Sequence, residues 1–333
     1  MAINSQRYLR RSYLFMCTDP VHVGTGGYRL GRVDNSIARE PGTNVPKIPG
    51  TSLHGAARAY SASLYEKANC AGQGQQKNGD TTTGHCGSCK ICYTFGYTKS
   101  ASSTESYSGV VNVFDAQLLF FPVHSMVGPV WITTPSRLEM AGFTFGELPE
   151  GWNSEAVLTT LEHEGSLNLG WLVFQTKGKI IITTDYYELS CNKRWKQISN
   201  RIVLVHDNTF SHLVNSNLEV RTSVAIDPER GAAVDKALFT YEALPRTTVL
   251  VADVVLDDYR ETGFNEDGIA ANMTSKGSLL PGGIAWNSAI DVLHSGLKMI
   301  EWLGVGGMGT RGFGRMALLG SPKNETYGEE TKS

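Results

Sequence analysis

The pattern of hydrophobic and polar positions along the chain predicts more strand than helix. Apolar residues alternate with polar ones, or form short unbroken runs, as they do in half-buried and fully buried strands. Strands are predicted at residues 11–17, 110–123 (one long strand or a strand pair), 130–138, 170–175, 179–189, 201–207 and 248–257. Residues 218–242 are predicted as two strands around a turn at 227–231.

Helices are predicted in fewer places. Apolar residues recur on one helical face from Thr51 onward and again over 288–303. Residues 153–164 are predicted as a short surface helix, and 321–333 as a flexible tail. The mixture predicts an α+β fold. No segment holds the roughly 20 apolar residues that a membrane-spanning helix needs, so we expect a cytoplasmic protein without membrane contact.

Residues 69–109 differ from the rest because they are rich in Gly, Gln, Ser, Thr and Cys and have almost no apolar periodicity. A C-x-x-C-x-x-C motif and one upstream cysteine lie here: Cys70, Cys86, Cys89 and Cys92. Four thiolates at such spacing can complete the tetrahedral coordination of a structural Zn²⁺ ion. We therefore predict an insertion held by zinc rather than by a core. His85 could replace Cys70, and four reduced cysteines in a loop are the alternative.

The two remaining cysteines, Cys17 and Cys191, lie in strand-like segments and are predicted to be core residues.

Charge is balanced over the whole chain but uneven along it. Thirty Lys and Arg residues against 32 Asp and Glu residues give a net charge of −2, which excludes a generally basic surface. Residues 29–58 nevertheless carry five basic residues and two acids, whereas 253–268 carry six acids and one arginine. This asymmetry favours binding of an extended polyanion on one side of the molecule, although ordinary scatter of surface charge is the alternative.

Asp34 is the candidate for chemistry. It lies among arginines in the loop sequence GRVDN. An aspartate beside bound phosphate is tolerated where it holds a metal ion or positions a reacting hydroxyl. A loop-capping role is the alternative. No Ser-His-Asp elbow, H-E-x-x-H or G-x-S-x-G motif is present, so hydrolases of those classes find no support.

The glycine-rich stretch GVGGMGTRGFGR follows the predicted helix over 288–303. Glycines let backbone N–H groups approach an anion closely. The stretch matches neither the nucleotide-hydrolase nor the dinucleotide pattern, so we exclude both. A tight connection between a helix and a strand is the alternative.

These motifs together resemble those of a known family. GTGGYRLGRVDNSIAREPGTNVPKIPGTSLHGAAR and GVGGMGTRGFGRM are similar to glycine loops of the RAMP superfamily of CRISPR proteins. VFDAQLLFFPVHS, VWITTPSRL, ALFTYEALP and CGSCKICYTFG resemble segments of the repeated backbone subunit of type III-B (Cmr) effector complexes. The aspartate loop also resembles that of the type III-A (Csm) backbone subunit. The matches run from residue 22 to 316.

The resemblance implies one domain over residues 1–320. It would have a ferredoxin-like, RRM-like palm, a zinc-bearing insertion at about 69–109 and a β-hairpin thumb at about 215–245. Copies of the chain would line up along a guide crRNA beside other type III effector subunits. Asp34 falls on the family's catalytic aspartate. The implied reaction is cleavage of complementary target RNA at regular intervals, by 2′-hydroxyl attack assisted by Mg²⁺ or Mn²⁺.

Residues predicted to bind the guide are Arg32, Arg39, Ser52, His54, Arg58, Gly306, Gly307, Gly309, Thr310 and Arg311. Thumb residues predicted to wedge between bases are Val224, Ile226 and Leu238, with a place in the core as their alternative. Many relatives carry lysine where this chain has His54, and a neutral imidazole binds phosphate more weakly.

Two other functions stay open at this point. One is a non-catalytic crRNA-binding scaffold of a type III-A or III-B complex, in which Asp34 is structural. The other is a nuclease of the same superfamily that processes precursor crRNA through a histidine, for which His22 is the candidate.

Overall fold

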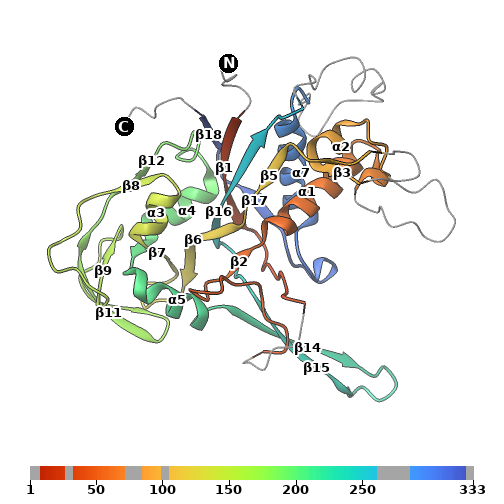
Figure 1. Ribbon diagram of the computed structural model, residues 1–333. Helices are drawn as coiled ribbons and strands as arrows, with labels where there is room; N and C mark the ends of the chain where they lie inside the picture. Colours follow the sequence, from red (N-terminus) through yellow and green to blue (C-terminus); the bar gives the residue numbers. More distant parts are fainter. Residues whose placement is uncertain (1–7, 27–32, 72–84, 99–104, 261–285, 328–333) are drawn as a thin grey trace.

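A computed structural model describes residues 8–26, 33–71, 85–98, 105–260 and 286–327 (Figure 1). The described strands form one large mixed sheet of 12 strands and three small two-stranded sheets, and helices cover the large sheet. The main path of the large sheet runs β10-β11-β9-β13-β7-β6-β16-β1-β17. Among the described residues, no helix is long and apolar enough to cross a membrane.

The centre of the sheet is the antiparallel pair of β1 (Tyr8–Cys17) and β16 (Val249–Asp257), in register from Tyr8 opposite Asp257 to Met16 opposite Val249. Strands β5 (Val111–Val113) and β6 (Ala116–Val123) pair with successive parts of the other edge of β16. The apolar run at 110–123 is therefore two strands that follow one another along β16, neither one long strand nor two strands paired with each other. The sheet is completed here by β2 (Lys47–Ile48), β17 (Met316–Leu318) and β18 (Lys323–Thr326).

The other half of the sheet combines short strands and short helices. Its strands are β7 (Val130–Thr133), β9 (Ala156–Thr159), β10 (Gly165–Leu169), β11 (Leu172–Lys179) and β13 (Ile202–Leu204). Its helices are α3 (Pro135–Met140), α4 (Lys193–Ile198), η2 (Ser199–Arg201) and α5 (Asp207–Ser216). A separate pair is formed by β8 (Phe143–Phe145) and β12 (Ile182–Thr184).

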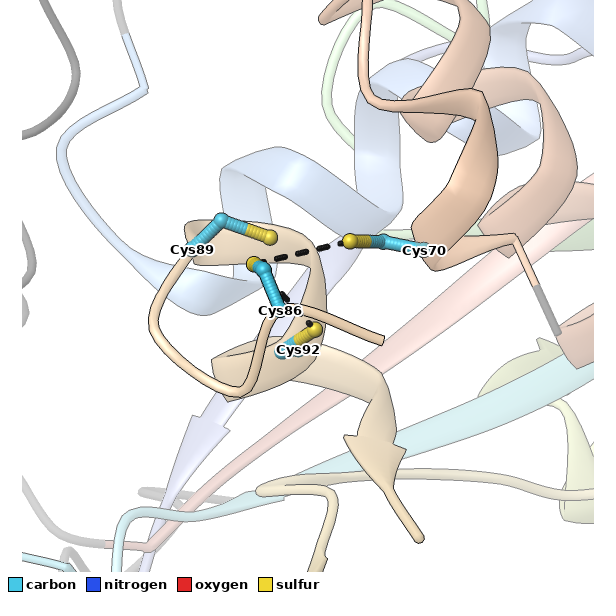
Figure 2. A group of neighbouring side chains, drawn as sticks. All are labelled: Cys70, Cys86, Cys89 and Cys92. Carbon is cyan, nitrogen blue, oxygen red and sulfur yellow. Dashed lines mark hydrogen bonds between the residues drawn. The ribbon is translucent and has the colours of Figure 1, made fainter. Parts of the chain in front are cut away.

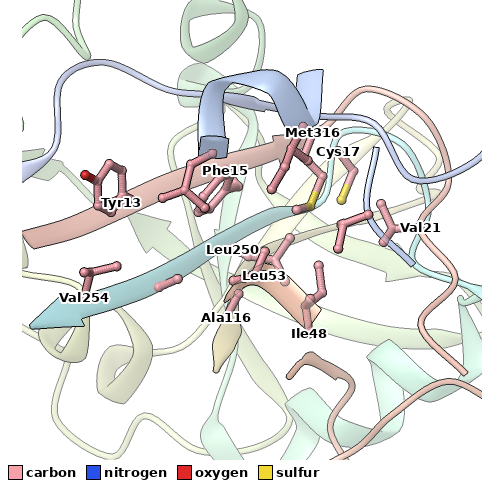
Figure 3. Close-up of a cluster of buried hydrophobic side chains, with 14 of the residues drawn as sticks. Tyr13, Phe15, Cys17, Val21, Ile48, Leu53, Ala116, Leu250, Val254 and Met316 are labelled. Carbon is pink, nitrogen blue, oxygen red and sulfur yellow. The ribbon is translucent and has the colours of Figure 1, made fainter. Parts of the chain in front are cut away.

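The central strands of the large sheet, β1, β6, β7 and β16, are buried on both faces over most of their length, which explains why they are almost continuously apolar. In β1, Tyr13, Phe15 and Cys17 point into one hydrophobic cluster, and the intervening Leu14 and Met16 point into a second. Figure 3 shows the first cluster, where residues of β1 and β16 meet Leu53 of the first long helix. Full burial of each large side chain stabilises the fold by about 1.5–3 kcal/mol.

Two long helices, α1 (Gly50–Leu64) and α7 (Ala289–Leu303), lie side by side over this first cluster (Figure 1). They approach closely because Gly296 has no side chain. A Cβ atom there would lie 2.2 Å from the Ala57 carbonyl oxygen. Ser61 donates its hydroxyl to the Val292 carbonyl at 2.7 Å across the same contact.

The β-hairpin predicted over 218–242 is present and projects away from the sheet (Figure 1). It consists of β14 (Glu219–Ile226) and β15 (Ala233–Ala243). Its turn is stabilised by Asp227, whose Oδ1 accepts the N–H groups of Glu229 and Arg230. The two strands of the hairpin pair with each other. The described residues near its turn belong to none of the hydrophobic clusters.

Several predictions about local structure are wrong. The strand predicted over 130–138 ends at Thr133 and is followed by helix α3, and most of the strand predicted over 179–189 is absent, with Ile182–Thr184 as its main strand segment. Residues 153–164 are not a helix, because Ala156–Thr159 is a fully buried strand between β11 and β13. The tail is not wholly flexible, because β18 pairs with β1. Cys191 is exposed, whereas Cys17 is buried as predicted. The two short helices α4 and α5 were not predicted, since neither presents more than two or three apolar residues.

The cysteine-rich segment is also better packed than predicted. It forms η1 (Ala68–Cys70), α2 (Lys90–Phe95) and a small sheet of β3 (Gly96–Tyr97) and β4 (Tyr107–Ser108). Ile91, Tyr93 and Phe95 are buried in the first hydrophobic cluster. The expectation that this segment lacks a core is therefore wrong, because its short helix shares the core of the sheet.

The close crossing of α1 and α7 generates a prediction about stability. Gly296→Ala should lower the free energy of unfolding by about 1–3 kcal/mol, because the new methyl group overlaps the backbone of α1. Gly55→Ala is the matched control. Its Cβ meets nothing within 4 Å, and alanine favours a helix over glycine by about 1 kcal/mol. Urea unfolding followed by circular dichroism measures both, and equal midpoints for Gly296→Ala and wild type would contradict the crossing.

Candidate nucleic-acid interface and metal centre

Asp34 lies at the base of the β14–β15 hairpin, where its side chain is exposed. Its Oδ2 accepts two hydrogen bonds from Thr240 of β15, from the backbone N–H at 2.7 Å and from the hydroxyl at 2.9 Å. The Asp34 N–H in turn donates to Thr240 Oγ1 at 3.1 Å. The hydrogen bonds from the backbone and side chain of Thr240 lower the pKa of Asp34, so the carboxylate is ionised at neutral pH.

Behind Asp34, a buried ion pair joins the loop to the hairpin. The Arg39 guanidinium lies 2.7 Å from a carboxylate oxygen of Glu242, and it also donates to the Asn215 side chain and the Asn44 carbonyl. His22 Nδ1 donates to the Glu242 carbonyl at 2.6 Å, and His22 is only 6% exposed. Arg39, predicted to bind RNA, is therefore engaged within the protein.

The glycine-rich loop packs against the same His22 segment. Gly307 donates its N–H to the His22 carbonyl at 2.8 Å, and Gly306 has a φ of +86°. A Cβ atom on Gly306 would lie 2.4 Å from the same carbonyl oxygen, so no other residue fits there. The N–H of Gly307 is thus occupied in this conformation. Gly309, Thr310 and Arg311, in the 3-10 turn η3 (Gly309–Arg311), are exposed.

Aromatic rings link the glycine-rich loop to the hairpin base. Tyr241 of β15 makes an edge contact with Phe313, with ring centroids 5.4 Å apart. Arg221 of β14 lies over the Phe313 ring at 4.8 Å, and Arg311 lies over Phe239 at 5.8 Å. The Asp34 loop, the hairpin base and the glycine-rich loop thereby meet at one place, although they are far apart in sequence.

The start of α1 carries two further candidates. Ser52 is in the first turn of the helix, whose Gly50 N–H donates to Asp115 at 2.7 Å. His54 is half-buried, with its ring edge-on to Phe95 at 5.1 Å. Burial, and next the charge of Arg58, lower the pKa of His54, so this side chain is neutral at pH 7.

The basic stretch at 29–58 is largely neutralised where it is described. Lys47 forms ion pairs with Asp115 at 2.6 Å and Glu40 at 2.9 Å. Arg39 is paired with Glu242, and Arg58 is bonded to backbone carbonyls. Arg32 lies outside the described residues, as do residues 261–268 of the acidic stretch. In the described part of this site, Arg311 is therefore the exposed basic side chain that a polyanion could reach.

The four cysteines converge on one point (Figure 2). Their sulfur atoms all lie within 4.8 Å of one another, with Cys70 Sγ 3.5 Å from Cys86 Sγ and 3.9 Å between the sulfurs of Cys86 and Cys92. Sulfurs on the corners of a tetrahedron lie about 3.8 Å apart when each bonds zinc at about 2.3 Å. The donor set therefore fits a tetrahedral metal ion, and Cys70 rather than His85 completes it.

Arg58 holds the frame of this metal centre. Its guanidinium donates to the Cys70 carbonyl at 2.9 Å and to the Gly96 carbonyl at 2.8 Å, and it lies 3.1 Å from His85 Nδ1. The hydrogen bond with Cys70 lowers the pKa of the Cys86 thiol, whereas hydrogen bonds with Cys70 raise the pKa of the Cys89 and Cys92 thiols. Arg58 thus joins both ends of the cysteine-rich segment to α1.

The three hairpin residues predicted as wedges are exposed. The exposed fraction is 40% for Val224, 60% for Ile226 and 65% for Leu238. Val224 is directly opposite Leu238 in the hairpin. The alternative that these residues belong to the core is therefore wrong, and the projecting hairpin carries exposed apolar side chains.

Sequence reasoning missed Thr240 and Phe313 as parts of this site. Thr240 is 206 residues from Asp34, and no local pattern marks it as a partner. Phe313 lies among glycines, and the sequence pattern there indicates only a glycine-rich loop. One signal in the sequence was available for Thr240. Side chains alternate between the faces of a strand, so Thr240 is expected on the same face as the predicted wedge residue Leu238.

Comparisons with known proteins agree with this architecture. The model of the RAMP superfamily matches residues 14–317. The CRISPR system Cmr endoribonuclease Cmr4 of Pyrococcus furiosus is 28% identical over 254 residues, which cover 71% of this chain and 78% of that protein. The CRISPR system Cms endoribonuclease Csm3 of Methanothermobacter thermautotrophicus is 31% identical over 96 residues, 28% of this chain and 34% of that protein.

A solved structure shows the same fold. A chain of the type III-B Cmr-beta complex in its apo state superposes with a TM-score of 0.58 at 12% identity, covering 96% of this chain and 98% of that one. The α+β fold is therefore shared with a Cmr complex protein. Because the family model spans residues 14–317, the chain belongs to the RAMP superfamily.

Proposed function

We propose that this chain is the backbone subunit of a type III-B CRISPR effector complex. It binds guide crRNA along its length and cleaves complementary target RNA at regular intervals. One observation carries the proposal: an ionised, exposed Asp34 carboxylate lies at the base of a projecting apolar hairpin. The relative from Pyrococcus furiosus, itself named an endoribonuclease, supports RNA cleavage. Further copies of the chain and other type III subunits would be its partners.

In this proposal the large sheet with α1 and α7 is the ferredoxin-like, RRM-like palm, and the β14–β15 hairpin is the thumb. Val224, Ile226 and Leu238 insert between bases of the guide–target duplex. Unstacking a base step costs a few kcal/mol, which apolar wedges offset by burial. A target nucleotide displaced in this way comes to lie near the hairpin base, where Asp34 is.

Cleavage follows in-line attack by the target's own 2′-hydroxyl. The bond from the 2′-oxygen to phosphorus forms, and the bond from phosphorus to the 5′-oxygen breaks. The 2′-hydroxyl loses its proton and the 5′-oxygen gains one, so the products are a cyclic phosphate and a 5′-hydroxyl. A Mg²⁺ or Mn²⁺ ion would supply charge stabilisation for this step. Asp34 would hold that ion and orient the attacking hydroxyl.

Guide binding is assigned to the exposed turn that follows α7 and to the start of α1. Thr310, Arg311 and Ser52, with the backbone of Gly306 and Gly309, contact phosphates without reading sequence. Arg32 remains a predicted contact. His54 is a weak contact because its side chain is neutral. Arg39, Arg58 and Gly307 support the site from inside, since their donors are used within the protein.

The alternative is a non-catalytic crRNA-binding scaffold of a type III-A or III-B complex. The reciprocal hydrogen bonds of Asp34 and Thr240 are the observation in its favour, because a carboxylate bonded in this way also caps a loop. Processing of precursor crRNA through His22 finds less support, since that ring is buried and bonded to Glu242.

A cleavage ladder separates catalysis from scaffolding. The chain is assembled with its partner subunits on a guide RNA, and end-labelled complementary RNA is added with Mg²⁺ or Mn²⁺. Asp34→Ala should abolish the regular cuts, with at least about a 100-fold lower rate, and leave target binding unchanged. Glu229→Ala, at the exposed hairpin turn, is the control for loss of an acidic group. Cuts that persist in Asp34→Ala would establish the scaffold instead.

We further propose that the four-cysteine cluster holds one structural Zn²⁺ ion. Elemental analysis of the purified chain should find about one zinc per chain. Cys92→Ser should lose the metal and unfold at a lower temperature, because metal binding contributes to folding free energy. Cys191→Ser removes an exposed cysteine outside the cluster. This variant should keep its zinc and unfold at the wild-type temperature. Zinc content unchanged in Cys92→Ser would contradict the assignment.

Substitution of two arginines distinguishes a side chain that bonds within the protein from one that binds RNA. Arg58→Met should lower the free energy of unfolding by about 1.5–3 kcal/mol, because it removes charged hydrogen bonds to two carbonyls. Arg311→Met should leave thermal unfolding unchanged and weaken crRNA binding in a filter assay. The assignment is wrong if Arg58→Met weakens crRNA binding and melts at the wild-type temperature.

A further inference from the structure

We infer that Thr240 is a positioning residue for RNA cleavage: its hydroxyl and N–H hold one oxygen of Asp34 so that the other faces the RNA. This inference rests on the proposed function, since it assigns a task within the cleavage site. Thr240 lies in β15 of the hairpin, and Asp34 lies in a loop 206 residues earlier in the chain.

The geometry distinguishes the two carboxylate oxygens. The backbone N–H and the hydroxyl of Thr240 both donate to Asp34 Oδ2, at 2.7 Å and 2.9 Å. Besides Thr240, the only further donor to the exposed carboxylate in the described part of the chain is the N–H of Asp34 itself, which also donates to Thr240 Oγ1. Two hydrogen bonds on one oxygen fix the plane of a carboxylate, whose terminal torsion is otherwise broad. Oδ1 is therefore directed outward, with lone pairs for a cation or a hydroxyl proton.

The hydroxyl adds something that the backbone does not. The loop and strand are already joined by Asn35 N–H to the Thr240 carbonyl at 3.0 Å, and by Glu242 N–H to the Asn35 carbonyl at 3.0 Å. These bonds do not depend on the side chain at 240. The hydroxyl both donates to Oδ2 and accepts the Asp34 N–H at 3.1 Å. Its removal should therefore disturb the carboxylate more than the fold.

The position of Thr240 also connects cleavage to duplex opening. Thr240 and Leu238 are two residues apart in β15, so their side chains emerge on the same face. The strand that carries an apolar wedge thus also holds the carboxylate. A displaced nucleotide and Oδ1 would be placed by one rigid element, which favours a fixed distance between them.

Two substitutions at 240 isolate the hydroxyl. Thr240→Val keeps the shape of the side chain and removes the hydroxyl, whereas Thr240→Ser keeps the hydroxyl. In the assembled complex, Thr240→Val should lower the single-turnover rate at saturating target by about tenfold. Target affinity and melting temperature should be unchanged. Thr240→Ser should cleave at nearly the wild-type rate. Thr222→Val is the matched control, because Thr222 pairs with Thr240 across the hairpin.

The outcomes separate this inference from the proposed function. Wild-type cleavage by Thr240→Val, with Asp34→Ala inactive, overturns the inference and leaves the function intact. Undiminished cleavage by Asp34→Ala overturns both. If Thr240→Val does not assemble, Thr240→Ser and Thr240→Ala decide. A fast serine variant with a slow alanine variant supports a positioning hydroxyl, and equal rates overturn it.

Discussion

The arrangement of the site depends on the buried contacts around His22. Its ring donates to the Glu242 carbonyl, its own carbonyl accepts the Gly307 N–H, and the neighbouring Val21 pairs with Leu244. Three segments remote in sequence are fixed to one another by these bonds. Buried backbone groups left unpaired would each cost about 1–3 kcal/mol. The segment of Val21 and His22, the hairpin base and the glycine-rich loop therefore cannot shift independently.

The sequence was sufficient to predict elements whose burial follows a simple period. The strand at 11–17 and the helix over 288–303 are present because their apolar residues match the faces that the fold covers. Residues 153–164 were misread because the short apolar run Ala156–Thr159 has the same appearance in a helix and in a buried strand. The run forms a strand because it pairs with β11 and β13. Such pairing depends on residues outside the run, so the run alone does not reveal it.

In the candidate site, too, some residues could be predicted from local sequence and others could not. The cysteine spacing predicted a cluster that the structure brings together, because motif ligands lie close in sequence. The role of Arg58 within that cluster was hidden, since its acceptors are backbone carbonyls at Cys70 and Gly96. A basic residue in a glycine-rich sequence suggests phosphate, but only the folded chain shows whether an internal acceptor is nearer. The same holds for Arg39 and Glu242.

The charge on Asp34 is the feature that a purely structural role explains least well. A loop-capping residue needs only a hydrogen-bond acceptor, and asparagine or serine would serve. Thr240 instead stabilises the ionised form, because both of its donors favour a carboxylate. A fixed negative charge beside bound RNA is repelled by phosphate unless a cation lies between them. In the proposed function, a cation held by this exposed carboxylate would remove that repulsion, which a loop cap alone would leave in place.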